Sequence, residues 1–150
     1  MAHRYDNGAA TSSRPGSAVL AWLRLVRVFQ KVRRASEARF RDFGLSAAQF
    51  DVLAQVGAAE GSSQQQVADA LLLTKSNVCQ LLDRMERSGL IERRPAGRAK
   101  RLYLTPVGRR LYADAVPAHA RLIAERLSAL SPPEQRRLLR LLRTVDRAPS

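Results

Sequence analysis

This chain of 150 residues has few cysteines and histidines, no long apolar run and few acidic residues. Cys79 is the only cysteine, which excludes an internal disulfide framework and fits a reducing compartment. The two histidines, His3 and His119, are isolated in the sequence and, with one cysteine, predict neither a metal cluster nor a nucleophile with its base. We therefore expect no metal, no cofactor and no catalytic residues, so the chain should not be an enzyme.

Long apolar runs are the second scarcity. A helix that spans a bilayer needs about 20 consecutive apolar residues, and no segment of this sequence meets that requirement. Arg24 and Arg27 interrupt the apolar run nearest the N-terminus, which argues against a signal peptide. We expect a soluble, cytoplasmic protein that does not partner a membrane.

Acidic residues are the third scarcity. Lys and Arg number 26 against 13 for Asp and Glu, a formal net charge of +13. Such an excess points to a polyanionic partner, first nucleic acid and second an anionic membrane surface. The length and the 45% hydrophobic content suit one compact unit or two small coupled ones.

The chain is predicted to begin with a flexible arm and a long helix. Residues 1–17 mix Gly, Ala, Ser, Arg and Pro without periodicity, as flexible segments do. Residues 18–44 then repeat apolar side chains at intervals of three and four, which predicts a dimerisation helix that Gly44 ends. The repeating positions include Trp22, Leu25, Val26, Phe29 and Val32.

Capping residues divide the next stretch, residues 45–105, into three short helices. Ser46 with Gln49 forms a capping-box pattern, either Ser62 or Ser63 can cap the second helix, and Thr74 can cap the third. "IERR" and "RLYL" are candidate strands on either side of "PAGRAK", with Ile91, Leu102 and Leu104 available for the inner side. We call residues 45–105 the head.

Two further helices are predicted in residues 106–150, which we interpret as a C-terminal dimerisation region. Thr105 and Pro106 suit the start of a helix that runs to about Leu130, and Pro117 should bend it. Ser131, Pro132 and Glu134 form the start of the last helix.

The third short helix of the head has one apolar and one polar side. The apolar residues at helical spacing, which should face the core, are Val78, Leu81, Leu82 and Met85. The opposite side carries Ser76, Gln80, Asp83, Arg84 and Arg87. Side chains of the first turn can reach base edges in a major groove about 12 Å wide. Gly89 supplies the left-handed residue that ends the helix.

A dense basic cluster follows in the predicted hairpin: Arg93, Arg94, Arg98, Lys100 and Arg101. Such a tip can lie along phosphates or place an arginine in a narrow minor groove. Short helices followed by a basic two-stranded wing are the elements of a winged helix-turn-helix.

These segments resemble the MarR family of bacterial transcriptional regulators. The resemblance lies in "LSAAQFDVLAQV", "QQQVADALLLTKSNVCQLLDRMERSGLIERR" and "LYLTPVGRRL". It implies a mainly α fold with a small two- or three-stranded β-wing, and a homodimer with intertwined terminal helices. It also implies that a small ligand, or cysteine oxidation in some members, lowers the affinity for DNA. The family's wing usually carries Asp-x-Arg, whereas this chain has Ala96, Gly97 and Arg98 in a wing that looks short.

Three sets of site residues follow from the residues and the resemblance. For double-stranded DNA we expect contacts from Ser63, Gln64, Thr74, Lys75, Ser76, Asn77, Gln80, Arg84, Arg93, Arg94, Arg98, Lys100 and Arg101. The resemblance places a pocket for an aromatic or phenolic effector near Trp22, Phe29 and Phe50, although Trp22 also suits a core position. Cys79 is either a small filler or a redox switch whose thiolate Lys75 and Arg84 would favour.

The sequence thus predicts a homodimeric, sequence-specific regulator, a repressor of a pseudo-palindromic operator that a small effector releases. Two other functions stay open. One is a sequence-nonspecific nucleic-acid binder of the nucleoid or of RNA, which would use the same basic face. The other is a ligand-binding protein or enzyme that uses the interface pocket.

Overall fold

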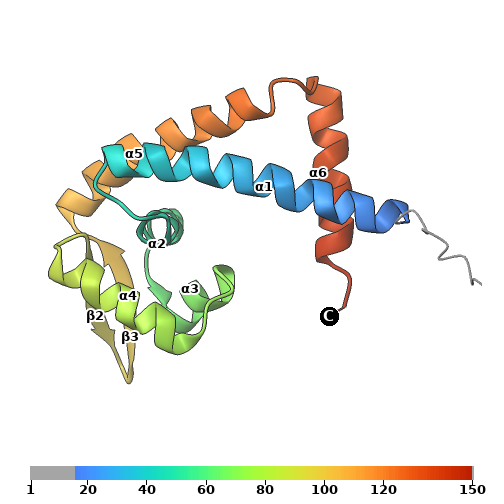
Figure 1. The fold of residues 1–150 in the computed structure, drawn as a ribbon. Coiled ribbons are helices and arrows are strands. Elements are labelled where there is room, and N and C mark those ends of the chain that lie inside the picture. Colours follow the sequence, from blue (N-terminus) through green and yellow to red (C-terminus); the bar gives the residue numbers. More distant parts are fainter. Residues whose placement is uncertain (1–15, 150) are drawn as a thin grey trace, which may run out of the picture. The chain divides into compact units, whose positions relative to one another are not determined.

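The structure, a computed structural model, describes residues 16–149, so the predicted arm lies outside the described residues except for Gly16 and Ser17. Six helices and three short strands make up the described chain, as the mainly α prediction requires (Figure 1). In order they are α1 (Ser17–Asp42), α2 (Ala47–Ala58), β1 (Ser62–Ser63), α3 (Gln64–Ala70), α4 (Lys75–Arg87), β2 (Ile91–Ala96), β3 (Ala99–Leu104), α5 (Pro106–Arg126) and α6 (Pro132–Asp146). The chain divides into two compact units at Val32, within α1.

The predicted caps begin the helices of the head. The Ser46 hydroxyl accepts from the Gln49 backbone N–H, and the Gln49 side chain accepts from the Ser46 N–H. Ser63 forms the same reciprocal pair with Gln66, which decides between the two serines proposed. Thr74 accepts from Asn77 at the start of α4. Each cap satisfies backbone donors that a helix end leaves without partners, and typically stabilises by about 1 kcal/mol.

The core of the head lies where α2, α3, α4 and the β2–β3 hairpin meet. The apolar face of α4 is buried as predicted, with Val78, Leu82 and Met85 fully enclosed. Ile91, Leu102 and Leu104 cover this core from the hairpin side, also as predicted. Leu53 and Val56 of α2 complete it.

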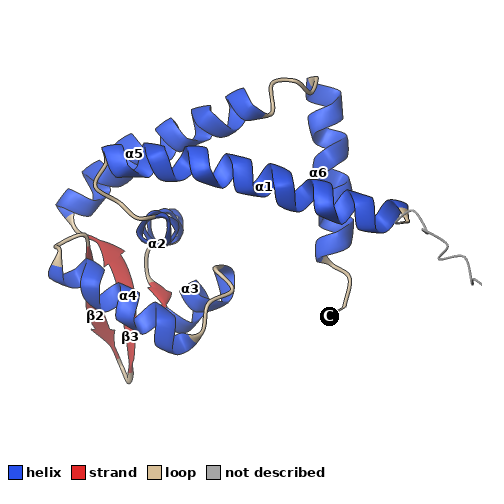
Figure 2. Ribbon diagram, viewed as in Figure 1, coloured by secondary structure: helices blue, strands red, loops and turns tan. Residues whose placement is uncertain are grey.

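A three-stranded antiparallel sheet in the order β1-β3-β2 forms the wing and its base (Figure 2). A third strand was allowed by the resemblance, but its place was not predicted, because Ser62 and Ser63 carry a capping pattern and no strand pattern. They pair with Leu102 and Arg101 of β3. The stretch "PAGRAK" was expected to separate the strands, but Ala96 pairs with Ala99. Only Gly97 and Arg98 form the turn, and Gly97 takes the positive φ of 64° that this tight turn needs.

The start of α5 packs closely against the segment that connects α4 to β2. A Cβ atom built at Gly108 would lie 1.9 Å from the backbone oxygen of Leu90, so no side chain fits there. Thr105 caps α5, and the helix continues through Pro117. It ends at Arg126 and not near Leu130, because Leu127 to Leu130 form turns that lead to the Ser131 cap of α6.

Several helix faces stay uncovered in the described chain. No residue of α6 is buried, although it carries the exposed apolar side chains Leu139, Leu141, Leu142 and Val145. Large exposed apolar side chains also lie on the first half of α1: Val19, Leu20, Trp22, Leu23, Leu25, Val28 and Phe29. None of the described helices is long and apolar enough to cross a membrane.

Candidate nucleic-acid interface

The exposed side of α4 brings six of the predicted DNA contacts together. Each of these side chains is exposed, and all belong to the helix or its cap: Thr74, Lys75, Ser76, Asn77, Gln80 and Arg84. Helical spacing places Ser76, Asn77 and Gln80 on neighbouring positions of one face, opposite Val78 and Leu82. This arrangement offers hydroxyl, amide and ammonium groups at the helix N-terminus, where an anion is favoured.

The wing separates its five basic residues between two faces. Side chains alternate along a strand, so Lys100 shares the face of Leu102, while Arg94 and Arg101 lie on the other. Arg94 stacks 4.0 Å above the Tyr103 ring and pairs with Glu92, and Arg101 Nη1 donates to the backbone oxygen of Gly61 at 3.3 Å. Arg98, at the turn, and Lys100 are exposed and make no ion pair within residues 16–149.

The base of the wing is fixed by a carboxylate. Glu60 Oε1 accepts from the Leu104 backbone N–H at 3.0 Å, and its Oε2 lies 2.9 Å from Arg109 Nη1. The hydrogen bond from Leu104, with help from Arg109, holds the pKa of Glu60 below its usual value of 4.5. The end of β3 is thereby tied to the loop after α2.

Arg93, predicted as a DNA contact, turns inward. Its side chain is only 12% exposed, and its Nη1 lies 2.7 Å from Asp83 Oδ1. Gln64, predicted in the same set, accepts a hydrogen bond from Arg93 Nη2 at 3.2 Å. Ser63 serves as the α3 cap.

Cys79 lies half-buried beside this group. Its Sγ is 3.7 Å from Gln64 Oε1, within the range of a weak S–H hydrogen bond. A small polar side chain at this position therefore has a structural partner, and the redox switch stays a prediction.

A second cluster joins the end of α1 to α2 and α5. Phe40 and Phe50 stack with their ring centroids 4.1 Å apart, and His119 packs against both rings. Ser36 Oγ lies 3.0 Å from His119 Nε2. Burial lowers the pKa of His119 below 6.5, although the nearby Asp51 charge opposes that shift. The sequence contained no signal for this cluster, because its members are far apart in the chain.

The three residues predicted for an effector do not all lie in this cluster. Phe50 is buried in it, whereas Trp22 and Phe29 belong to the other compact unit and are 62% and 57% exposed. The predicted pocket therefore stays a prediction.

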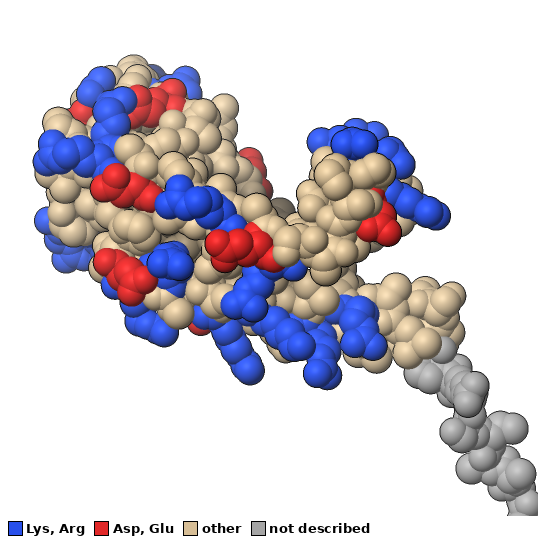
Figure 3. Space-filling model, turned by 90° about the horizontal axis from the view of Figure 1, so that it is seen from above, with Lys and Arg blue, Asp and Glu red and all other residues tan. Residues whose placement is uncertain are grey.

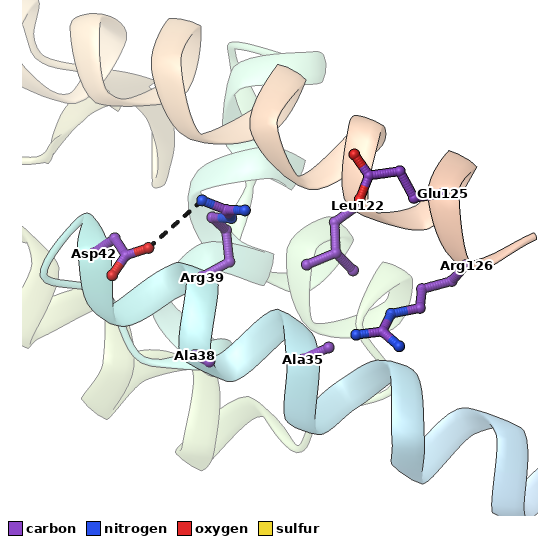
Figure 4. Close-up of a pocket in the computed structure, with 7 residues that line it drawn as sticks. All are labelled: Ala35, Ala38, Arg39, Asp42, Leu122, Glu125 and Arg126. Carbon is purple, nitrogen blue, oxygen red and sulfur yellow. Dashed lines mark ion pairs between the residues drawn. The ribbon is translucent and has the colours of Figure 1, made fainter.

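An open groove lies between the end of α1 and the end of α5 (Figure 4). Its volume is about 620 Å³, and Ala35, Ala38 and Leu122 form its apolar part. Arg39, paired with Asp42 at 3.7 Å, and Arg126 bring cationic groups to it. Asp42 and Glu125 add two carboxylates, so the charged lining of the groove is balanced, and its size suits a small molecule.

Basic and acidic side chains are interspersed on the face shown in Figure 3. The positive excess of the chain is therefore not a single continuous patch on that face.

Comparison with known proteins finds one family. A family model described as the MarR family matches residues 43–102, which include α2, α3, α4, β2 and most of β3. The chain is 34% identical over 120 residues to the HTH-type transcriptional regulator YkoM of Bacillus subtilis (strain 168), a match that covers 78% of each chain.

Solved structures agree with this match. A mutant of MarR from E. coli, complexed with operator DNA, is 25% identical with a TM-score of 0.77, and the match covers 89% of this chain and 99% of that one. A MarR family protein of Mycobacterium tuberculosis, complexed with salicylic acid, is 25% identical with a TM-score of 0.65, over 89% and 98% of the two chains.

Proposed function

The chain belongs to the MarR family of DNA-binding transcriptional regulators, and from this premise we propose that it is a homodimeric repressor of a pseudo-palindromic operator, released by a small effector. Such a regulator works in the cytoplasm, where bacterial DNA lies. The observation that carries the proposal is the polar, exposed face of α4 beside the cations of the wing.

Sequence readout is assigned to α4. Asn77 and Gln80 carry amides, which can make paired hydrogen bonds to adenine in the major groove. Arg98 and Lys100 of the wing are assigned to phosphates or to the minor groove, where charge matters more than base identity. The two elements thus have different tasks on the same duplex.

Dimerisation is supported by the uncovered apolar side chains of α1 and α6. Exposed apolar faces of this extent are typical of interfaces, and a second copy of the chain offers the same faces in return. The two heads should then lie about one DNA turn apart, roughly 34 Å, to reach successive major grooves.

The effector is proposed to be a small aromatic or phenolic acid. The salicylic acid bound by the relative from M. tuberculosis supports this chemistry. In the groove, Arg126 is the proposed partner of the effector's carboxylate, because Arg39 is already paired with Asp42. Adding salicylate should weaken the binding of DNA by the wild type, and Arg126→Ala should reduce that response.

The central test begins with selection of duplexes from a random library by the wild-type protein. We expect the selected duplex to bind at least about 10³-fold more tightly than random duplex. A ratio near one would contradict a regulator and support the sequence-nonspecific nucleic-acid binder.

Two substitutions then separate readout from charge. Gln80→Ala should cost about 1 to 3 kcal/mol on the selected duplex and little on random DNA. Arg98→Ala should weaken both and reduce the salt slope by about one unit. If Gln80→Ala and Asn77→Ala both left the preference unchanged, α4 would not be the reading surface.

A further inference from the structure

Arg93 sits at the junction of three elements of the head. It belongs to β2, where it pairs in register with the buried Leu102 and so faces α4. Its Nη1 reaches Asp83 at 2.7 Å and Glu86 at 3.5 Å, both on α4. Its Nη2 donates to Gln64 Oε1 of α3 at 3.2 Å and to the backbone oxygen of Cys79 at 3.4 Å. One guanidinium on β2 therefore contacts both α3 and α4.

These contacts leave Arg93 poorly suited to bind phosphate. Both terminal nitrogens are occupied within the protein, and the two carboxylates carry more negative charge than the guanidinium carries positive charge. The neighbouring Arg94 and Lys100, by contrast, are exposed. A guanidinium that left this site to contact DNA would leave two carboxylates of α4 without their cation.

The position of Arg93 lets it hold the angle between α4 and the β2–β3 hairpin. The tip of the wing carries Arg98 and Lys100, and the start of α4 carries the amides assigned to base readout. Both groups must meet one duplex at the same time, so the angle between α4 and the hairpin matters. A planar guanidinium with several fixed donors holds such an angle better than a single point charge does.

A second consequence is electrostatic. Asp83 and Glu86 have side chains that are 55% and 43% exposed, on the helix assigned to a polyanionic partner. Without Arg93 they would repel phosphates. Arg93 thus offsets one of the two negative charges on this side of α4 from inside the protein.

We propose that Arg93 is a positioning residue, which holds α3, α4 and the wing in the geometry that reads one sequence, and that it does so without touching DNA. This inference rests on the proposed function, since it concerns how the same site achieves sequence preference. It assigns specificity to a residue of the wing whose side chain points away from the surface.

The test compares one substitution at two arginines of the hairpin, Arg93→Met and Arg98→Met. On the duplex selected by the wild type, Arg93→Met should reduce the ratio of selected to random affinity about tenfold, and its salt slope should match that of the wild type once the repulsion by Asp83 and Glu86 is removed, as in the triple variant described below. Arg98→Met should weaken both DNAs and reduce the slope by about one. A reduced slope with an unchanged ratio for Arg93→Met would show a phosphate contact and overturn the proposal.

Two further variants separate geometry from neutralisation and from simple loss of fold. Arg93→Lys keeps a cation near Asp83 but cannot bond both Asp83 and Gln64 through a fixed fork, so we expect an intermediate ratio. The triple variant Asp83→Asn, Glu86→Gln, Arg93→Met removes the repulsion, and it should remain about tenfold less selective than wild type. Full recovery of the ratio in the triple variant would leave Arg93 a neutralising role only, and would also overturn the proposal.

A measurement without DNA keeps this inference distinct from the proposed function. Hydrogen exchange of the amides in Ile91–Ala96 should be faster in Arg93→Met than in Arg98→Met, because only the first loses its ties to α3 and α4. If the wild type selected no duplex, the proposed function would fail, and equal exchange in the two variants would refute the positioning role by itself.

Discussion

Helices α4 and α6 carry similar amphipathic patterns, yet the apolar side of α4 is buried and that of α6 is exposed. In α4, Val78, Leu82 and Met85 are fully buried within the chain. In α6, Leu142 is 38% and Val145 is 72% exposed. Apolar periodicity therefore identifies the side of a helix that packs against a partner, but it does not show whether that partner belongs to the same chain. The helix that remains uncovered is the one for which we propose a second copy as partner.

The largest effect is expected in the core of α4. Leu82→Ala should lower the free energy of unfolding by about 2 to 5 kcal/mol, because it removes buried apolar atoms and leaves a cavity. Leu142→Ala in α6 is the matched control. Urea denaturation at a low and a high protein concentration would measure both. A loss independent of concentration for Leu82→Ala, and a loss that depends on concentration for Leu142→Ala, would confirm the comparison. The same concentration dependence in both variants would contradict the difference between α4 and α6.

The next effect tests the uncovered face of α6. Exchanging Leu141 and Leu142 for serine should raise the dimer dissociation constant about tenfold or more, since interface leucines lose apolar burial. Sedimentation equilibrium measures this directly. Exchanging the exposed Arg136 and Arg137 for serine controls for changes in α6 itself. A dimer that is as tight in the leucine variant as in the wild type would mean that this face is not the interface.

A smaller gain is expected at the turn between α3 and α4. Leu72 has a φ of 53°, a strained backbone conformation for a residue with a Cβ atom, and its side chain is 94% exposed, so no burial offsets the strain. Leu72→Gly should raise the free energy of unfolding by about 1 kcal/mol, because glycine adopts positive φ without a steric penalty. Thermal denaturation beside Leu73→Gly, whose backbone is not in this region, provides the comparison. A lower stability for Leu72→Gly would contradict the strain.

The smallest effect concerns the pH dependence of stability, which the buried cluster around His119 should influence and the exposed α6 should not. Burial between Phe40 and Phe50 lowers the pKa of His119, so below pH 6.5 the unfolded chain binds a proton more readily than the folded one. The stability conferred by neutral His119 is therefore present above pH 6.5 and is lost as the pH falls through the folded value. Urea midpoints at several pH values should fall less steeply over this range for His119→Gln than for wild type. Parallel curves would exclude the histidine as the cause.

Much of the head, and the start of α6, was predictable, because the signals are local. Ser46, Ser63, Thr74 and Ser131 each bond a backbone group three residues further on, so a short window contains the whole interaction. The buried side of α4 follows from spacing within one helix in the same way. The family resemblance rested on these same segments, and the comparisons confirmed it.

The features that were not predicted depend instead on pairing between strands. Strand β1 exists because Ser62 and Ser63 meet β3 about forty positions later in the chain, and nothing in two serines indicates a strand. The wing turn is shorter than expected because Ala96 pairs with Ala99, a register that a basic segment does not reveal.

The sequence by itself determined where the helices begin, which side of α4 enters the core and that a basic hairpin follows it. The tertiary structure alone decided what each cation of that hairpin does. Arg93 and Arg94 are neighbours with the same side chain, yet Arg93 meets Asp83, Glu86 and Gln64, and Arg94 meets Tyr103 and Glu92. Alternation along the strand sends them to opposite faces, and the distant residues on each face set their partners.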